Sequence, residues 1–220
     1  MISVAIDGPS GAGKSTLAKR LAKELGYLYV DTGAMYRSIG LFALRKGVDP
    51  KDEAAITALL PQIQIELRYV NGAQRVLLCG EDVSEAIRAE EVGMATSAVS
   101  AHPPVRAFLL ELQRGMARTH DILMDGRDIG TVILPNASVK IFLTASAEAR
   151  ATRRFRELQE KGVDTDFETV LEDIRRRDYQ DSHRATAPLR QAEDAVLVDT
   201  SEMDLEESFQ ALKSLILSRV

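Results

Sequence analysis

Residues 8–16 of the chain are Gly8-Pro9-Ser10-Gly11-Ala12-Gly13-Lys14-Ser15-Thr16. This loop follows a β-prone run at residues 2–6 and precedes a helix-like stretch at residues 17–25. Glycines let consecutive backbone N–H groups turn toward an anion, and a helix that starts there adds its unsatisfied amides and the positive end of its dipole. Lys14 supplies a mobile ammonium for outer phosphates, and the Ser15 hydroxyl can ligate Mg²⁺. The context therefore predicts a phosphate site for a nucleoside triphosphate, and not a turn that only caps a helix.

The bulk composition is that of a globular chain. Its 220 residues suit one domain, and hydrophobic and charged contents of 45% and 28% are ordinary. A net charge of −5 argues against a nucleic-acid polymer as partner. One cysteine, Cys79, excludes an intrachain disulfide, as is typical of a reducing compartment. Because we find neither an apolar run of membrane-spanning length nor a leader pattern, we expect a cytoplasmic protein without a membrane partner.

Short apolar runs alternate with helical patterns along most of the chain. The predicted strands are residues 2–6, 27–30, 122–124, 139–143 and 195–198. The predicted helices are residues 14–25, 34–46, 52–60, 85–100, 105–118, 147–161, 167–177 and 205–219. The residues expected to face inward in the last helix are Leu205, Phe209, Leu212, Leu215 and Ile216. Five short apolar strands separated by helices predict an α/β fold with a five-stranded parallel sheet covered on both faces.

One segment departs from this alternation. Apolar and polar residues alternate from Ile63 to Tyr69, Asn71-Gly72 follows, and residues 75–79 are again β-like. Asn-Gly between two such runs is the strongest short hairpin signal. We therefore expect an inserted β-hairpin near residues 63–79.

Three polar stretches follow strands of the predicted sheet. They are residues 8–16, Asp31-Thr32-Gly33, and Asp125-Gly126-Arg127-Asp128. Because ligands bind at the carboxyl ends of parallel strands, we expect all three stretches at one edge of the sheet. Arg37 and Arg127 are forked donors suited to the phosphate of an acceptor.

Several classes of protein share such a phosphate-binding loop. The Asp-x-x-Gly and Asn-Lys-x-Asp tetrapeptides of GTPase switches do not occur in the sequence. A small core, an insertion and two basic helices around a polar loop favour a small phosphotransferase with a lid. Two alternatives remain open: a kinase for a small metabolite such as shikimate or dephospho-coenzyme A, and a non-catalytic nucleotide-dependent switch.

Four motifs carry a resemblance to a known family. They are residues 8–16, Asp31-Thr32-Gly33-Ala34-Met35-Tyr36-Arg37, residues 125–128, and residues 177–188. Together they resemble the bacterial cytidylate kinases over essentially the whole chain. The resemblance implies transfer of the γ-phosphoryl group of ATP to CMP or dCMP, with Mg²⁺, and UMP stays open as an acceptor. It also implies one P-loop kinase domain over residues 1–220, with a monophosphate-binding region at roughly 34–120 and a helical lid at roughly 150–185.

The resemblance also implies the site residues. The catalytic residues would be Lys14, Arg127, Arg177 and Arg184. The ATP-binding residues would be residues 8–16 together with Arg153 and Arg154, and Ser15 would be the metal ligand. The CMP-binding residues would be Thr32, Tyr36, Arg37, Ser97, Arg106, Asp125, Arg127, Asp128, Arg177, Asp181 and Arg184. Among these, Ser97, Arg106 and Asp128 would read the base, and Asp181 would hold the ribose hydroxyls.

Ordinary structural roles compete with these assignments. From the residues alone, Ser97 and Arg106 are equally well explained as solvated positions on a helix surface. Arg153 and Arg154 belong to a basic helix face that nearby glutamates could balance. A phosphate acceptor is already anionic, so we expect no general base. Without an extended apolar helix to suggest a coiled partner, we expect a monomer.

Overall fold

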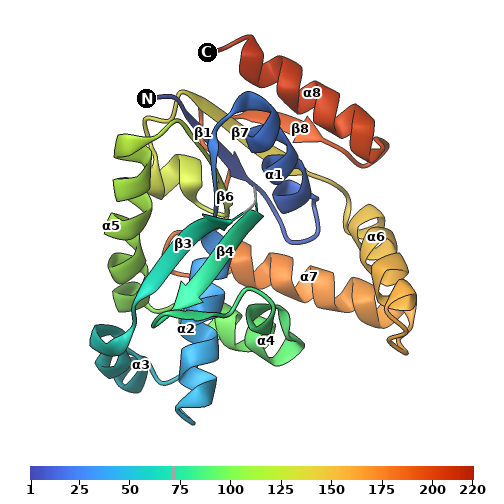
Figure 1. The fold of residues 1–220 in the computed structure, drawn as a ribbon. Coiled ribbons are helices and arrows are strands. Elements are labelled where there is room, and N and C mark those ends of the chain that lie inside the picture. The colour runs from blue at the N-terminus through green and yellow to red at the C-terminus, as the bar shows by residue number, and fades with distance from the viewer. Residues whose placement is uncertain (71–72) are drawn as a thin grey trace. The chain divides into compact units, whose positions relative to one another are not determined.

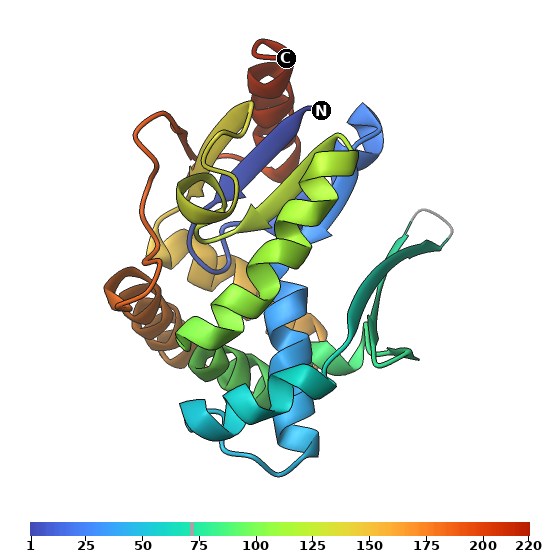
Figure 2. The same cartoon turned by 90° about the vertical axis from the view of Figure 1, so that its left-hand side faces the viewer.

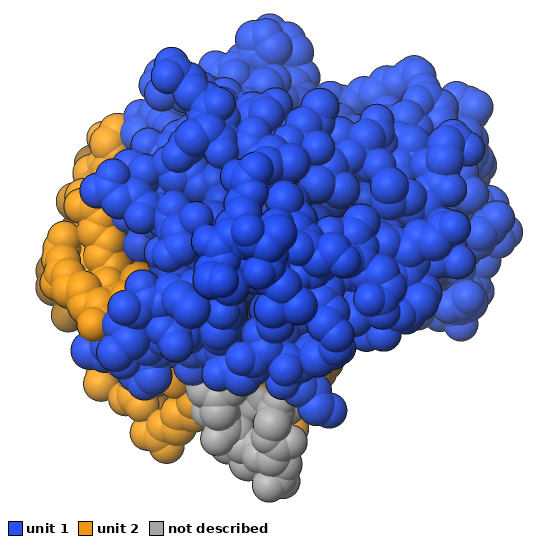
Figure 3. Space-filling model, turned by 90° about the horizontal axis from the view of Figure 1, so that it is seen from above, with its two compact units in different colours: residues 1–30, 119–220 blue, residues 31–118 orange. Residues whose placement is uncertain are grey.

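The computed structural model describes residues 1–70 and 73–220, and the chain divides into two compact units. The first, which we call the core unit, comprises Met1–Val30 and Thr119–Val220. The second, the inserted unit, comprises Asp31–Arg118 (Figure 3). The inserted unit therefore interrupts the core unit after its second strand.

The core unit is built on a parallel sheet. Among the described residues this sheet has five strands, in the order β2-β6-β1-β7-β8 (Figure 1). Their bounds are β1 Ser3–Asp7, β2 Leu28–Asp31, β6 Ile122–Gly126, β7 Val139–Thr144 and β8 Val196–Asp199. Ile6 of β1 lies opposite Asp125 of β6 and Ile141 of β7, both in parallel pairings. The predicted five-stranded parallel sheet is confirmed.

Helices of the core unit flank this sheet. They are α1 Lys14–Leu25, η3 Ile129–Ile133, α6 Ala147–Glu160, α7 Phe167–His183 and α8 Leu205–Leu217. Helices α1 and α8 lie side by side (Figure 1). Leu21 and Phe209 belong to one apolar cluster with Ile141 of the sheet. Helix α1 begins inside the predicted phosphate loop, so packing of its apolar face fixes that loop against the sheet.

Helices α6 and α7 pack on each other over a small apolar cluster of their own. Its buried members are Ala151, Val170, Leu171 and Ile174. Phe155 and Phe167 add an edge-to-face contact with ring centroids 6.1 Å apart. This pair of helices thus has a separate core from the one that holds α1 and α8.

The inserted unit contains helices and a small antiparallel sheet. Its helical elements are α2 Thr32–Arg45, α3 Glu53–Leu59, η1 Leu60–Gln62, η2 Ala86–Arg88, α4 Glu90–Val99 and α5 Pro103–Thr119. Its strands are β3 Ile65–Val70, β4 Ala73–Leu78 and β5 Glu81–Asp82. Strands β3 and β4 lie side by side (Figure 2) and pair antiparallel. Ile65 is opposite Leu78 in this pairing. The Asn71-Gly72 turn lies outside the described residues.

Four local expectations are corrected. The helix expected at residues 85–100 is interrupted at Ala89, whose φ and ψ of −59° and 146° are not helical. Helix α7 does not end at Arg177 but continues to His183. Helix α5 includes Pro103 at its start, where a missing N–H costs nothing. Leu205 is 53% exposed because it occupies the first turn of α8.

Within the part of the chain that the structure describes, no helix has both the length and the apolar character needed to span a membrane.

Candidate active site

The phosphate loop follows β1 and leads into α1. Gly8, Gly11 and Gly13 have φ values of 151°, 76° and 86°, which residues with a Cβ rarely adopt. A Cβ on Gly8 would lie 1.9 Å from the carbonyl oxygen of Leu143, so only glycine fits between β1 and β7. Gly13 stands in the left-handed conformation directly before α1. The loop therefore has the backbone that a nest of N–H groups requires.

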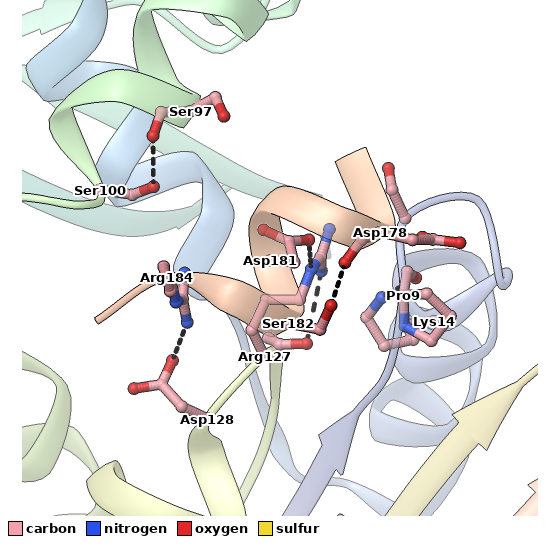
Figure 4. Close-up of polar contacts among 12 residues, drawn as sticks. Pro9, Lys14, Ser97, Ser100, Arg127, Asp128, Asp178, Asp181, Ser182 and Arg184 are labelled. Atoms are coloured by element: carbon pink, nitrogen blue, oxygen red, sulfur yellow. Dashed lines mark hydrogen bonds and ion pairs between the residues drawn. The ribbon is translucent and has the colours of Figure 1, made fainter. Parts of the chain in front are cut away.

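Lys14 lies at the start of α1 and is only 6% exposed. Its Nζ donates a hydrogen bond to the carbonyl oxygen of Pro9 at 2.7 Å, across the loop (Figure 4). Burial, followed by the positive charge of Arg127, lowers the pKa of Lys14 from 10.5 to about 7. The carboxylates of Asp125, Asp181 and Asp7 act in the opposite direction. The ammonium would thus be stabilised by any further negative charge.

The next residue, Ser15, connects the loop to β6. Its Oγ donates to Oδ2 of Asp125 at 2.7 Å, and the hydroxyl of Tyr29 donates to Oδ1 at 3.0 Å. Asp125 is buried at the carboxyl end of β6. A hydroxyl and a carboxylate side by side are oxygen ligands of the kind that Mg²⁺ prefers. Among the described residues there is no group of three or more His, Cys, Asp or Glu side chains that could hold a metal by itself.

The loop after β6 is tied to α7 and the residue that follows it by two ion pairs. Nε of Arg127 donates to Oδ2 of Asp181 at 2.7 Å. Nη2 of Arg184 donates to Oδ1 of Asp128 at 3.4 Å (Figure 4). Arg184 also donates from Nε to the carbonyl oxygen of Ala187 at 2.7 Å. These four predicted site residues are therefore brought together, although more than 50 positions separate the partners in sequence.

Arg177 belongs to the same group of cations. Arg177 is exposed on α7. Partial desolvation of its guanidinium, followed by the positive charge of Arg127, lowers its pKa, against the pull of Asp181. Lys14 and Arg177 are thus both destabilised as cations by the same neighbour, Arg127. Such crowding of positive charge is favourable only where an anion binds.

The arginines of α6 have protein partners in this structure. Arg150 is buried and binds Asp178 of α7 through two hydrogen bonds of 2.9 and 2.6 Å. It also donates to the carbonyl oxygen of Ser10 at 3.0 Å. Arg153 donates to the carbonyl oxygen of Thr200 at 2.5 Å, and Arg154 pairs with Glu157 at 3.0 Å. Arg150, not Arg153 or Arg154, is the α6 arginine that contacts the phosphate loop.

Five predicted CMP-binding residues belong to the inserted unit. Thr32 and Tyr36 are buried in α2. Arg37 donates from Nη2 to Asp31 Oδ2 at 2.8 Å, and its Nε is buried with no hydrogen-bond partner among the described residues. Arg106 is not a surface residue: it is 9% exposed, and its guanidinium lies 5.5 Å from the centre of the Tyr36 ring. The Ser97 carbonyl accepts a hydrogen bond from Ser100 Oγ at 3.1 Å.

Sequence reasoning missed three charged residues that shape the core unit. Asp7 accepts backbone hydrogen bonds from Ile129 and Gly130, and Asp178 anchors Arg150. Burial raises the pKa of Asp7 to about 6. A signal was present for Asp7, because a carboxylate ends an otherwise apolar strand. For Arg150 and Asp178 no local pattern distinguishes them from their charged neighbours.

The fold and this site define a class of protein. A parallel sheet, a glycine-rich loop leading into α1, and a cationic cluster beside that loop are the features of a P-loop phosphotransferase.

Comparison with known proteins narrows the class. The family model described as cytidylate kinase matches residues 4–217. The chain is 50% identical to the cytidylate kinase of Caldicellulosiruptor bescii over 214 residues, covering 97% of this chain and 95% of that one. It is 51% identical to the cytidylate kinase of Enterococcus faecalis over 215 residues, covering 98% and 95%. An uncharacterized protein from Eubacterium ventriosum shares the fold over the full length of both chains, with a TM-score of 0.53 and 13% identity.

The chain therefore belongs to the cytidylate kinase family. It is an ATP-dependent nucleoside-monophosphate kinase that phosphorylates CMP or dCMP.

Proposed function

We propose that the phosphate loop and the three cations Lys14, Arg127 and Arg177 bind the phosphates of ATP and of CMP during transfer. The observation that carries this proposal is that Lys14 and Arg177 both lie within electrostatic range of Arg127, whose positive charge adds to desolvation in lowering their pKa values. Phosphoryl transfer places negative charge on the peripheral oxygens of the moving group. Preorganised positive charge then stabilises the transition state without further reorganisation. The backbone of residues 8–16 would hold the ATP phosphates.

We propose the following residues as those that bind the acceptor. In the core unit, Arg127, Arg177 and Arg184 would contact the CMP phosphate, Asp181 the ribose, and Asp128 the N4 amino group of cytosine. Asp125 would also belong to the CMP-binding residues of the core unit. In the inserted unit the acceptor-binding residues would be Thr32, Tyr36, Arg37, Ser97 and Arg106. The buried Nε of Arg37, which has no hydrogen-bond partner among the described residues, supports the role of that residue, because buried guanidinium groups require acceptors.

We propose that Mg²⁺ is held by the Ser15 hydroxyl, with Asp125 as its neighbouring carboxylate. Their oxygens lie 2.7 Å apart and fit the ligand chemistry of this ion. When bound with ATP, the ion would neutralise charge on the β- and γ-phosphates. The protein's own part is to orient Ser15 through Asp125, which Tyr29 holds from the other side.

The catalytic contribution of the chain is alignment, charge and exclusion of water. No general base is assigned, because the attacking phosphate oxygen of CMP carries negative charge already. Water would compete for the γ-phosphoryl group, so the site must close over both nucleotides. We propose residues 34–120 as the monophosphate-binding region and residues 150–185 as the lid. Arg153 and Arg154 would bind ATP only after exchanging their present partners, Thr200 and Glu157.

We further propose that the protein acts as a monomer in the cytoplasm. The single cysteine of the chain is compatible with a reducing compartment. Sedimentation equilibrium over a wide concentration range tests the assembly state, and a mass twice that of the chain would contradict it.

An ADP-release assay with Mg·ATP tests the proposed substrates. The acceptors would be CMP, dCMP, UMP, AMP, shikimate and dephospho-coenzyme A, beside a reaction without acceptor. We expect rapid turnover with CMP and dCMP, slower turnover with UMP, and little with the others. Equal rates with UMP and CMP would contradict the role of Asp128 in selecting the base. Omission of Mg²⁺ should abolish turnover, and full activity in a chelator would overturn the metal assignment.

A further inference from the structure

Asp7 is the last residue of β1 and is 4% exposed. Its Oδ1 accepts a hydrogen bond from the backbone N–H of Ile129, and its Oδ2 accepts one from Gly130, both at 2.7 Å. These residues are the first two of η3. One carboxylate from the central strand thus satisfies two donors on a neighbouring loop.

The two donors are the kind that a helix leaves unsatisfied at its start. The residue in the capping position is Asp128, yet its side chain makes no capping hydrogen bond to η3. Asp128 Oδ1 instead lies 3.4 Å from Nη2 of Arg184. Asp7 therefore caps the start of η3 in place of Asp128. The Asp128 carboxylate instead accepts a hydrogen bond from Arg184.

Asp7 also holds the other end of the same loop. Its backbone is opposite Gly126 in the parallel pairing of β1 with β6. The pairing fixes Gly126, and the carboxylate fixes Ile129 and Gly130. Only Arg127 and Asp128 lie between these fixed points. Both residues belong to the proposed acceptor site.

Space around this contact is small. A Cβ on Gly130 would lie 3.4 Å from Oδ2 of Asp7 and 3.1 Å from Cδ of Lys140. The carboxylate is also close enough to Lys14 and Asp128 for their charges to act on it. Burial of the Asp7 carboxylate lowers the free energy of unfolding. A role in positioning the neighbouring loop therefore explains an aspartate here better than a role in stabilising the fold.

We propose that Asp7 is a positioning residue that clamps the loop of Arg127 and Asp128 and thereby sets the affinity and base selectivity for CMP. This inference rests on the acceptor roles proposed for Arg127 and Asp128. In this role Asp7 would contact neither nucleotide. It acts through the backbone on which the two acceptor residues are carried, next to Gly8, where the ATP loop begins.

The test is Asp7→Asn, whose side chain offers one acceptor oxygen in place of two. We expect the KM for CMP to rise by at least about tenfold and the CMP/UMP preference to fall, because a small misplacement of a binding group is kinetically expensive. The Kd for Mg·ATP should rise by at most about threefold, because residues 8–16 keep their hydrogen bonds and lose only the charge interaction of Asp7 with Lys14. The matched control is Asp204→Asn, which replaces the carboxylate that caps α8.

Two results would overturn the clamp. One is kinetics for Asp7→Asn equal to those of Asp204→Asn. The other is a parallel loss of CMP and Mg·ATP binding, which is the behaviour of a merely structural residue. The parent protein gives a separate readout by NMR: the amide protons of Ile129 and Gly130 should exchange slowly. Exchange as fast as in exposed loops would overturn the proposal even if Asp7→Asn failed to fold.

Comparison of Asp7→Asn with Asp128→Ala distinguishes a failure of this inference from a failure of the proposed role of Asp128. If Asp128→Ala loses base selectivity while Asp7→Asn does not, the clamp is wrong and the proposed role of Asp128 stands. If Asp7→Asn raises the KM for CMP while Asp128→Ala changes nothing, the role of Asp128 is wrong and the clamp acts through Arg127.

Discussion

Arg127 and Asp181 form an ion pair of 2.7 Å between the loop after β6 and helix α7. Desolvation, followed by the positive charge of Arg127, lowers the pKa values of both Lys14 and Arg177. The same guanidinium therefore binds a helix of the proposed lid and acts through its charge on Lys14 of the phosphate loop. A substitution at Arg127 therefore changes the charge that both Lys14 and Arg177 face.

Replacing Arg127 should damage transfer more than nucleotide binding. We expect Arg127→Lys to lower kcat by about 10²–10³-fold, because lysine retains the charge but not the planar fork that donates to two oxygens. Steady-state kinetics with saturating Mg·ATP and CMP measure this loss. The matched control is Arg176→Lys, an exposed arginine of α7 that pairs with Asp173 on the same helix. A kcat for Arg127→Lys within twofold of that control would refute the assignment.

The Arg150–Asp178 pair should stabilise the core unit and the phosphate loop together. Arg150 is buried, and its loss would leave Asp178 and the carbonyl oxygens of Ser10 and Ala145 without their donor. We expect Arg150→Met to lower the free energy of unfolding by about 2–4 kcal/mol. Affinity for Mg·ATP should fall as well, because Ser10 is held by this side chain.

Urea denaturation and nucleotide titration of the same variant measure the two effects. Arg175→Met is the comparison, since Arg175 pairs with Glu148 on the surface. That variant should change the free energy of unfolding by at most about 0.5 kcal/mol. If both variants lose the same stability, the buried contacts of Arg150 do not stabilise the core unit.

Asp128→Asn should alter the choice of base and not merely reduce activity. A carboxylate accepts from the N4 amino group of cytosine but repels the O4 oxygen of uracil. An amide can donate to O4, so we expect the CMP/UMP ratio of kcat/KM to fall by about tenfold or more. Competition between the two acceptors in one assay measures the ratio directly. An unchanged ratio would assign the recognition of the base to other residues.

The raised pKa of Asp7 predicts how stability depends on pH. The pKa is 3.8 for an unperturbed carboxyl and about 6 in the folded protein. Between these values the folded state binds the proton more tightly, so Asp7 destabilises the fold increasingly as pH rises from about 4 to 6. Above pH 6 the cost is constant at about 3 kcal/mol, and it disappears below pH 4.

Comparison with Asp7→Asn isolates this effect, because the other carboxylates are common to both proteins. The difference in unfolding free energy, parent minus variant, should increase by up to about 3 kcal/mol as pH falls from 7 to 4. Urea denaturation at several pH values within this window measures it. A difference independent of pH would mean that Asp7 keeps an ordinary pKa.

Much of the fold follows from local patterns. Helix α1 has its predicted bounds of Lys14–Leu25 because a left-handed glycine stands at each end, Gly13 and Gly26. The strands were identifiable because parallel strands buried on both faces are short apolar runs. Local patterns do not identify the break at Ala89 or the extension of α7 to His183, because the residues there suit a helix or a loop almost equally well.

The candidate site likewise contains residues that local sequence predicts and residues that it does not. Residues 8–16 act through their own backbone, so spacing and residue type are enough to predict a phosphate loop. The acceptor residues became recognisable only through motifs shared with a family, because an isolated Arg106 has no local feature that separates it from a surface arginine.

The sequence by itself thus determined the family, the sheet and the phosphate loop, since these depend on periodicity, glycines and contiguous motifs. Only the tertiary structure decided the partners: Asp7 with the loop after Asp128, Arg127 with Asp181, and Arg150 with Asp178. Each of these contacts joins positions that are far apart in the chain. The physical reason is that a charge buried near the carboxyl ends of the strands requires a polar partner. The element that packs beside it supplies that partner, wherever this element lies in the sequence.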